Sequence, residues 1–188
     1  MSTSLPNAPY HHGDLRNALL EAALVILERD GEAGLGLRDL ARAVGVSPAA
    51  PYRHFDNRAA LLEALAVTGY QRFTRAMEDV AEANPPDMLS VMGKTYVLFA
   101  LRNAALFRLM FSPQLKRDNR PGLRMAADAA FATLRHVGGS GDTRASRVTA
   151  LAAWARVHGL AVLLLDGQIA LQAGEDIEAL ISDIIERH

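Results

Sequence analysis

One short stretch of the chain, Gly36 to Phe55, carries side chains suited to binding phosphates and base edges. Tyr52, Arg53 and His54 follow one another near its end. A tyrosine hydroxyl or a histidine can donate to a phosphate, and an arginine can donate to a phosphate or to guanine. The residues just before them are small enough to let the backbone approach the bases: Ser47, Pro48, Ala49 and Ala50. This chemistry is that of a DNA-reading surface.

The spacing of apolar residues predicts two short helices joined by a tight turn in this stretch. One helical face is formed between 37 and 44 by Leu37, Leu40, Ala41 and Val44. Gly45 follows, where a left-handed helix end favours a residue without Cβ. Ser47 is a good N-cap and Pro48 suits a first helical position, so a second helix is expected over 48–54. Two helices joined in this way form a helix-turn-helix, whose second helix lies in the DNA major groove.

The charge of this region is local, because the domain around it is slightly acidic. Residues 1–70 hold six arginines and eight acidic residues, a net charge of −2, whereas residues 35–58 alone carry +2. Arg38 and Arg58 begin the helices on either side of the expected reading helix, where they are placed to hold phosphates. Phe55 is expected to pack inward. Any attraction to DNA must therefore come from a patch, not from net charge.

The remaining sequence predicts helices throughout and no strand, so the expected fold class is all-α. Asn84-Pro85-Pro86 is the clearest break in the chain. The expected helices cover about 15–29, 57–83, 88–102, 104–111, 121–137, 142–165 and 177–185, with a polar loop at 114–120.

Residues 13–73 resemble the N-terminal domain of TetR-type transcriptional repressors. The resemblance rests on DLRNALLEAALVILERDG, LRDLARAVGVSPAAPYRHF and NRAALLEAL. It implies DNA contacts from five positions: Arg38, Ser47, Tyr52, His54 and Arg58. A weaker match, Trp154 to Gly159, is similar to a C-terminal domain type with a Trp…His-Gly signature. The expected organisation is an N-terminal arm (1–12), a DNA-binding domain (13–73) and an effector-binding and dimerisation domain (74–188).

Two residues depart from the pattern of such repressors. Gly36 stands where a serine or threonine usually caps the first helix of the pair, so no hydroxyl is offered to phosphate there. Pro51 lies inside the expected reading helix and forfeits a backbone hydrogen bond. We therefore expect modest direct base readout, with phosphate contacts, groove shape and dimer geometry supplying much of the binding.

Methionine and aromatic side chains are spread over the C-terminal helices. Taken singly, each suits a hydrophobic core; taken together, they suit a plastic apolar pocket. The resemblance implies a small-molecule inducer, and the expected ligand-binding residues are Phe73, Met77, Met92, Tyr96, Phe99, Phe107, Met110, Phe111, Met125, Trp154 and His158.

The helix over 142–165 has two distinct faces. One carries Leu151, Trp154 and His158; the other carries small residues, which let helices approach closely. The resemblance implies a homodimer through the last two helices, and the expected interface is Val148, Ala152, Ala155, Gly159, Val162, Ile177, Leu180, Ile181 and Ile184. Which face meets the second copy is left open.

The leading interpretation is a ligand-responsive repressor on a palindromic operator, acting as a homodimer in the cytoplasm. No catalytic group, metal or cofactor is expected. The most apolar run, Leu160 to Leu165, is far short of the ~20 residues of a membrane helix. Two alternatives remain: a helical ligand- or partner-binding module without DNA readout, and a helical enzyme using His158 with Asp166 or another carboxylate. Absence of cysteine excludes disulfides and thiolate metal sites.

Overall fold

A computed structural model describes residues 15–137 and 143–187, and every regular element in these ranges is helical. The chain divides into two compact units, Met1–Leu65 and Ala66–His188, and the division falls inside one long helix, α3 (Arg58–Ala83). The N-terminal arm expected from the sequence (1–12) lies outside the described residues.

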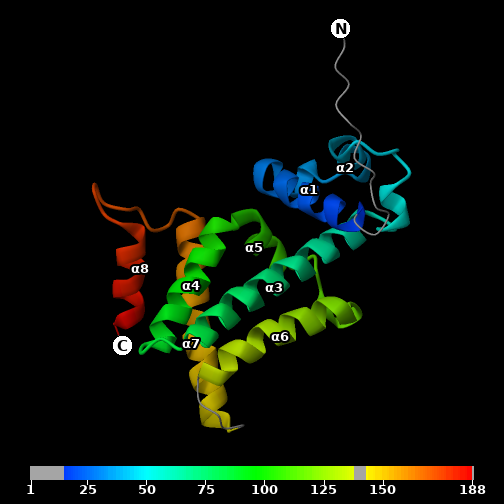
Figure 1. Cartoon of the computed structure of the whole chain (residues 1–188). Coiled ribbons are helices and arrows are strands. Elements are labelled where there is room, and N and C mark those ends of the chain that lie inside the picture. Colours follow the sequence, from blue (N-terminus) through cyan, green and yellow to red (C-terminus); the bar gives the residue numbers. More distant parts are fainter. Residues whose placement is uncertain (1–14, 138–142, 188) are drawn as a thin grey trace. The chain divides into compact units, whose positions relative to one another are not determined.

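The first unit contains α1 (Leu15–Asp30), a 3-10 turn η1 (Glu32–Gly34), α2 (Leu37–Val44), a second 3-10 turn η2 (Pro51–Arg53) and the start of α3 (Figure 1). The helix end predicted at Gly45 is confirmed: its φ is 75°, and the N–H groups of Gly45 and Val46 donate to the carbonyls of Arg42 and Ala41. This pair of bonds fixes the direction in which the chain leaves α2.

The α-helix predicted over 48–54 is wrong in type. Residues 48–50 form a turn, and Pro51–Arg53 form a 3-10 helix. An α-helix capped by Ser47 would need the N–H of residue 51 to donate to the Ser47 carbonyl, and proline has none. The amide of Ala50 donates to that carbonyl instead, at 2.9 Å. The proline therefore tightens the segment into i→i+3 bonding.

The second unit contains the rest of α3, α4 (Met88–Arg102), α5 (Ala104–Met110), a 3-10 turn η3 (Arg117–Asn119), α6 (Pro121–Val137), α7 (Arg144–Leu165) and α8 (Ile177–Glu186) (Figure 1). α4 contacts both α7 and α8, and α6 contacts α7. Four of the expected helices begin with a side-chain cap, since an oxygen of Asn57, Asp87, Thr143 or Asp176 accepts from an amide of the helix's first turn.

The segment 114–120 is not the simple polar loop that the sequence suggests. Leu115 is buried, and η3 lies within the segment. Nη2 of Arg117 donates to the Tyr70 hydroxyl at 2.6 Å, and its guanidinium lies 5.4 Å from the ring centres of both Tyr70 and Phe131. Tyr70 in turn donates to the carbonyl of Met110 at 2.8 Å. These contacts hold the segment against α3 and α6.

Candidate functional site: a DNA-reading turn and an apolar helical groove

Apart from Arg58, the residues expected to contact DNA face solvent or are half-buried; they are Arg38, Ser47, Pro48, Ala49, Ala50, Tyr52, Arg53 and His54. Between and after them, Pro51 and Phe55 are buried, which confirms the inward packing predicted for Phe55. The guanidinium of Arg16 lies 5.5 Å from the Phe55 ring centre. The two buried rings thus anchor the turn while its neighbours remain available to a partner.

Arg58 differs from the free phosphate clamp that its position suggested. Its Nε donates to the carbonyl of Leu35 at 3.0 Å, and its Nη2 donates to the carbonyl of Glu32. The Glu32 carboxylate lies 4.0 Å away as an ion-pair partner. Arg58 therefore braces the connection between α1 and α2 from the first residue of α3. Within the described residues, Arg38 and Arg53 make no such bonds, so they are the arginines free to meet phosphates.

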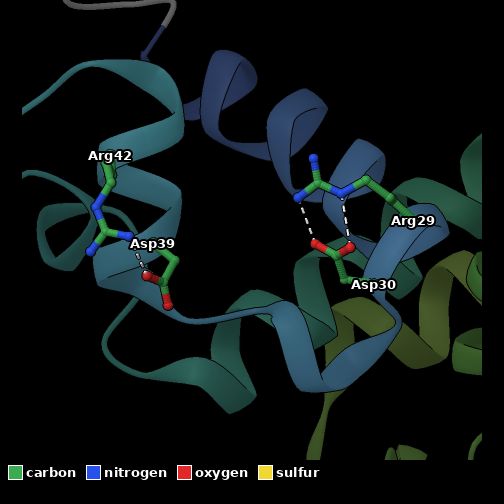
Figure 2. Close-up of polar contacts among 4 residues, drawn as sticks. All are labelled: Arg29, Asp30, Asp39 and Arg42. Carbon is green, nitrogen blue, oxygen red and sulfur yellow. Dashed lines mark hydrogen bonds and ion pairs between the residues drawn. The ribbon is translucent and has the colours of Figure 1, made fainter.

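A second pair of charges lies on α2 itself (Figure 2). Nη1 of Arg42 donates to Oδ1 of Asp39 at 3.0 Å, and both side chains are exposed. A Cβ built on Gly36 would lie 2.7 Å from Oδ2 of Asp39, so the missing side chain at position 36 leaves room for that carboxylate. Arg42 partly neutralises an acid that would otherwise repel phosphate at the start of α2. The other pair in Figure 2, Arg29 with Asp30, closes α1.

In the second unit, three polar side chains form one hydrogen-bonded chain. Nε1 of Trp154 donates to the Tyr96 hydroxyl at 3.1 Å, and that oxygen lies 2.9 Å from Nδ1 of His158. Tyr96 is 1% exposed, and burial raises its pKa. Burial lowers the pKa of His158. The sequence-based choice of His158 and Trp154 as neighbours is thus supported, and Tyr96 of α4 is the group that joins them.

Most of the expected ligand-binding side chains form a packed core around this chain. The rings meet edge-on or tilted: Phe73 against Tyr96 and Phe99, and Phe107 and Phe111 against His158. The buried members are Phe73, Met77, Met92, Tyr96, Phe99, Phe107 and Met110. Met125 does not belong to this set, because its side chain is 70% exposed. The sequence could not tell the inner from the outer face of α6 at this position.

An apolar groove of about 90 Å³ lies between α4, α7 and α8. Met92, Tyr96 and Trp154 of the expected ligand set line it. Four further lining residues were not expected from the sequence: Asp87, Gly93, Arg156 and Ile185. The sequence does single out Arg156, because it is the one charged residue of α7 between Arg147 and the helix end.

The small-residue face of α7 is exposed, so it is not part of the core of its own chain. Val148 is 56% exposed and Val162 36%, and a Cβ at Gly159 would meet nothing within 4 Å. Ala152 and Ala155 are exposed between them. On α8, Ile177, Leu180 and Ile184 are half-buried, but Ile181 is 0% exposed and belongs to the core. The expectation that Ile181 lies in the dimer interface is therefore wrong.

By length and composition, α7 also qualifies as a membrane-crossing helix among the described residues, with a mean hydropathy of 1.7 over 18 residues. A search for uninterrupted apolar residues does not identify α7 as such a helix, because Arg156 and His158 interrupt its apolar sequence. The helix nevertheless packs against α4 and α6, and one helix of this kind is weak evidence for a membrane.

His158 does not pair with Asp166, the first carboxylate that the enzyme alternative named. α7 is continuous from Arg144 to Leu165, His158 is bonded to Tyr96, and Asp166 pairs with Arg108 at 2.7 Å. Within the described residues, no cluster of three metal-ligating side chains is present.

Sequence models of protein families match both units. Residues 19–65 match the bacterial regulatory proteins of the tetR family, and residues 89–188, more than half of the chain, match the tetracyclin repressor-like C-terminal domain. The chain belongs to the TetR family. The resemblance read from the sequence is thereby confirmed, as are the all-α fold and the helix-turn-helix at its N-terminal end.

Solved structures agree with this TetR-family membership. A protein of unknown function from Rhodococcus sp. RHA1 is 36% identical, covering 95% of this chain and 97% of its own, with a TM-score of 0.78. The TetR-family regulator PfmR from Thermus thermophilus is 20% identical (90% and 97% covered, TM-score 0.63). FadR from Bacillus subtilis, solved with stearoyl-CoA, is 15% identical (90% and 95% covered, TM-score 0.65). The last two show a shared fold alone. No curated protein sequence matches the chain significantly.

As a TetR-family protein, the chain is a DNA-binding transcriptional regulator. Residues 47–54, which follow α2, form the second part of the helix-turn-helix. The second unit is the domain type that the family model covers at 89–188.

Proposed function

We propose that this TetR-family regulator is a cytoplasmic repressor that binds a palindromic operator as a homodimer and is released by a small apolar or amphipathic ligand. The observation that carries the proposal is the reading turn: Tyr52 is 48% exposed and Arg53 is exposed, while Pro51 and Phe55 on either side are buried. Because the buried Pro51 and Phe55 hold the turn in place, Tyr52 and Arg53 present their donors to DNA in a fixed direction.

The reading turn is short, which supports a dimer. One unit of this size contacts few bases, and two copies related by a two-fold axis double the contacts on a palindrome. We propose that the second copy covers the small-residue face of α7, formed by Val148, Ala152, Ala155, Gly159 and Val162. Exposed apolar side chains on this helix and the open space at Gly159 permit close helix packing there.

The ligand is expected in the groove between α4, α7 and α8. Its apolar lining and the neighbouring methionine and aromatic core suit an apolar group. The stearoyl-CoA bound by FadR is an amphipathic precedent within the same fold. Such a ligand acts only if its affinity differs between the DNA-binding and released states.

The proposal is tested by selecting bound duplexes from a randomised DNA pool with the full chain. We expect enrichment of two-fold symmetric sites, with half-site centres separated by about one helical turn, 34–36 Å, or a multiple of it. Enrichment of unsymmetrical sites would contradict the dimeric palindrome. Absence of any enrichment would support the alternative of a helical module without DNA readout.

A further inference from the structure

Arg156 caps the end of the last helix. Its Nη2 lies 2.8 Å from the carbonyl of Ile184, 2.7 Å from that of Ile185 and 2.8 Å from that of Arg187. The carbonyls in the last turn of a helix lack partners within the helix and carry partial negative charge. A guanidinium on α7 therefore supplies the positive charge and the donor that the C-terminal end of α8 lacks.

Arg156 also lines the apolar groove, and the C-terminal end of α8 forms one side of that groove. Ile185 lines the groove too, and it packs on Gly93 of α4: a Cβ at Gly93 would lie 3.1 Å from Cγ2 of Ile185. The close packing of α8 on α4 thus depends on Gly93. The position of the C-terminal end of α8 depends on its hydrogen bonds with Arg156. An occupant of the groove meets both residues.

We propose that the groove binds an aliphatic carboxylate, whose tail lies against Met92 and Trp154. Its carboxylate accepts hydrogen bonds from Arg156, which then donates fewer of them to the carbonyls of α8. This rests on the proposed function and identifies its ligand class. Arginine binds carboxylates through two parallel hydrogen bonds. Either bidentate edge of a guanidinium includes Nη2, which is the nitrogen that α8 uses. Nη2 has two N–H groups, which three carbonyls of α8 already share, and a bidentate carboxylate takes one of them, so ligand binding weakens the capping of α8.

Charge within the groove favours an anionic head at Arg156. The one other charged residue among its lining residues is Asp87, the N-cap of α4. Asp87 precedes Gly93 by six residues, which is about 9 Å along a helix axis. Arg156 instead bonds the carbonyl of Ile185, the residue packed on Gly93. A carboxylate whose tail fills the groove near Gly93 thus reaches the arginine without approaching Asp87.

The size of the groove limits the tail. A dry cavity of about 150 Å³ holds a benzene ring, so a space of about 90 Å³ suits a few methylene groups. Because the groove is partly open to solvent, a longer tail can extend beyond this space. Octanoate is the probe, with octan-1-ol as the neutral control and octylamine as the cationic control of the same length. Trp154 is the single tryptophan of the chain and lines the groove, so its fluorescence reports occupancy directly.

Fluorescence titration of the full chain should show octanoate binding at least tenfold more tightly than octan-1-ol. Arg156→Gln should weaken octanoate binding at least tenfold and leave octan-1-ol binding within twofold. Arg156→Lys, which keeps the charge without the bidentate fork, should fall between them. Arg147→Gln is the matched control, because Arg147 is an exposed arginine of α7 outside the groove, and it should bind like the unchanged protein.

Hydrogen exchange measures the competition at α8. Octanoate should speed exchange of the amides in residues 184–187, and Arg156→Gln should do so without ligand. Equal binding of octanoate and octan-1-ol, preference for octylamine, or octanoate binding that is unchanged in Arg156→Gln would overturn the proposal. So would protection of residues 184–187 by octanoate. None of these measurements uses DNA, so their failure is separate from a failure of operator binding.

Discussion

The hydroxyl of Tyr96 lies 2.9 Å from Nδ1 of His158 while accepting a hydrogen bond from the indole of Trp154 at 3.1 Å. With the oxygen accepting from the indole, its own proton can be donated to Nδ1 of a neutral imidazole that carries its proton on Nε2. Burial lowers the pKa of His158, which also favours this neutral form. A Trp…His signature read from sequence is thus part of a three-residue chain completed by α4.

Stability of the second unit should fall on acidification because of His158. Its pKa is lowered in the folded state from 6.5, so below that pH the unfolded chain binds a proton that the folded chain does not. The contribution is fully present above pH 6.5 and is lost as pH falls toward the folded pKa. Denaturant unfolding followed by Trp154 fluorescence should show this slope, and His158→Gln should remove it. His54→Gln, in the first unit, should leave the slope intact; persistence of the full slope in His158→Gln would refute the assignment.

Arg58→Ala should destabilise the first unit, because the carbonyls of Leu35 and Glu32 lose a charged donor. The cost is about 1–2 kcal/mol, at the low end for charged hydrogen bonds since the side chain is 45% exposed. Arg53→Ala, an exposed arginine of the same unit, is the control and should change stability by less than about 0.5 kcal/mol. Equal stability of the two variants, measured by urea unfolding, would show that Arg58 is not a brace.

Ala155→Glu should dissociate the proposed dimer without unfolding the chain. Ala155 is exposed on the small-residue face of α7, so the monomer accommodates a glutamate there, whereas a second copy would bury its charge. Sedimentation velocity should show the unchanged protein as a dimer and the variant as a monomer. Ala81→Glu, on an exposed position of α3, should remain dimeric.

If the unchanged protein is a monomer, the proposal that a second copy covers the small-residue face of α7 is wrong. Binding of the unchanged protein to lipid vesicles through α7, abolished by Ala155→Glu, would instead indicate that a membrane covers this face.

Much of the fold could be predicted because local signals agree with one another. Gly45, Asn57, Asp87, Thr143 and Asp176 end or cap helices where the sequence places them. Such signals depend on a few neighbouring residues, so they survive without knowledge of tertiary structure.

The sequence did not reveal the features that depend on backbone hydrogen bonding or on residues distant in the chain. Pro51 converted an expected α-helix into a 3-10 turn because it removed one donor. Arg58 proved to be occupied by carbonyls 23 and 26 residues earlier, and Arg156 by carbonyls 28 to 31 residues later. No periodicity in the sequence reports contacts of that range. The groove depends on such contacts, which is why only part of its lining was found.

The most direct test of the account is the affinity of the full chain for a selected operator, measured by fluorescence anisotropy at several salt concentrations. Tyr52→Ala combined with Arg53→Ala should reduce affinity at least a hundredfold while circular dichroism and oligomeric state stay unchanged, since both side chains are exposed. The unchanged protein should lose affinity steeply as salt rises, because phosphate contacts release counterions. Unaltered affinity in the double variant, or a salt slope near zero, would contradict the central claim that this turn reads DNA.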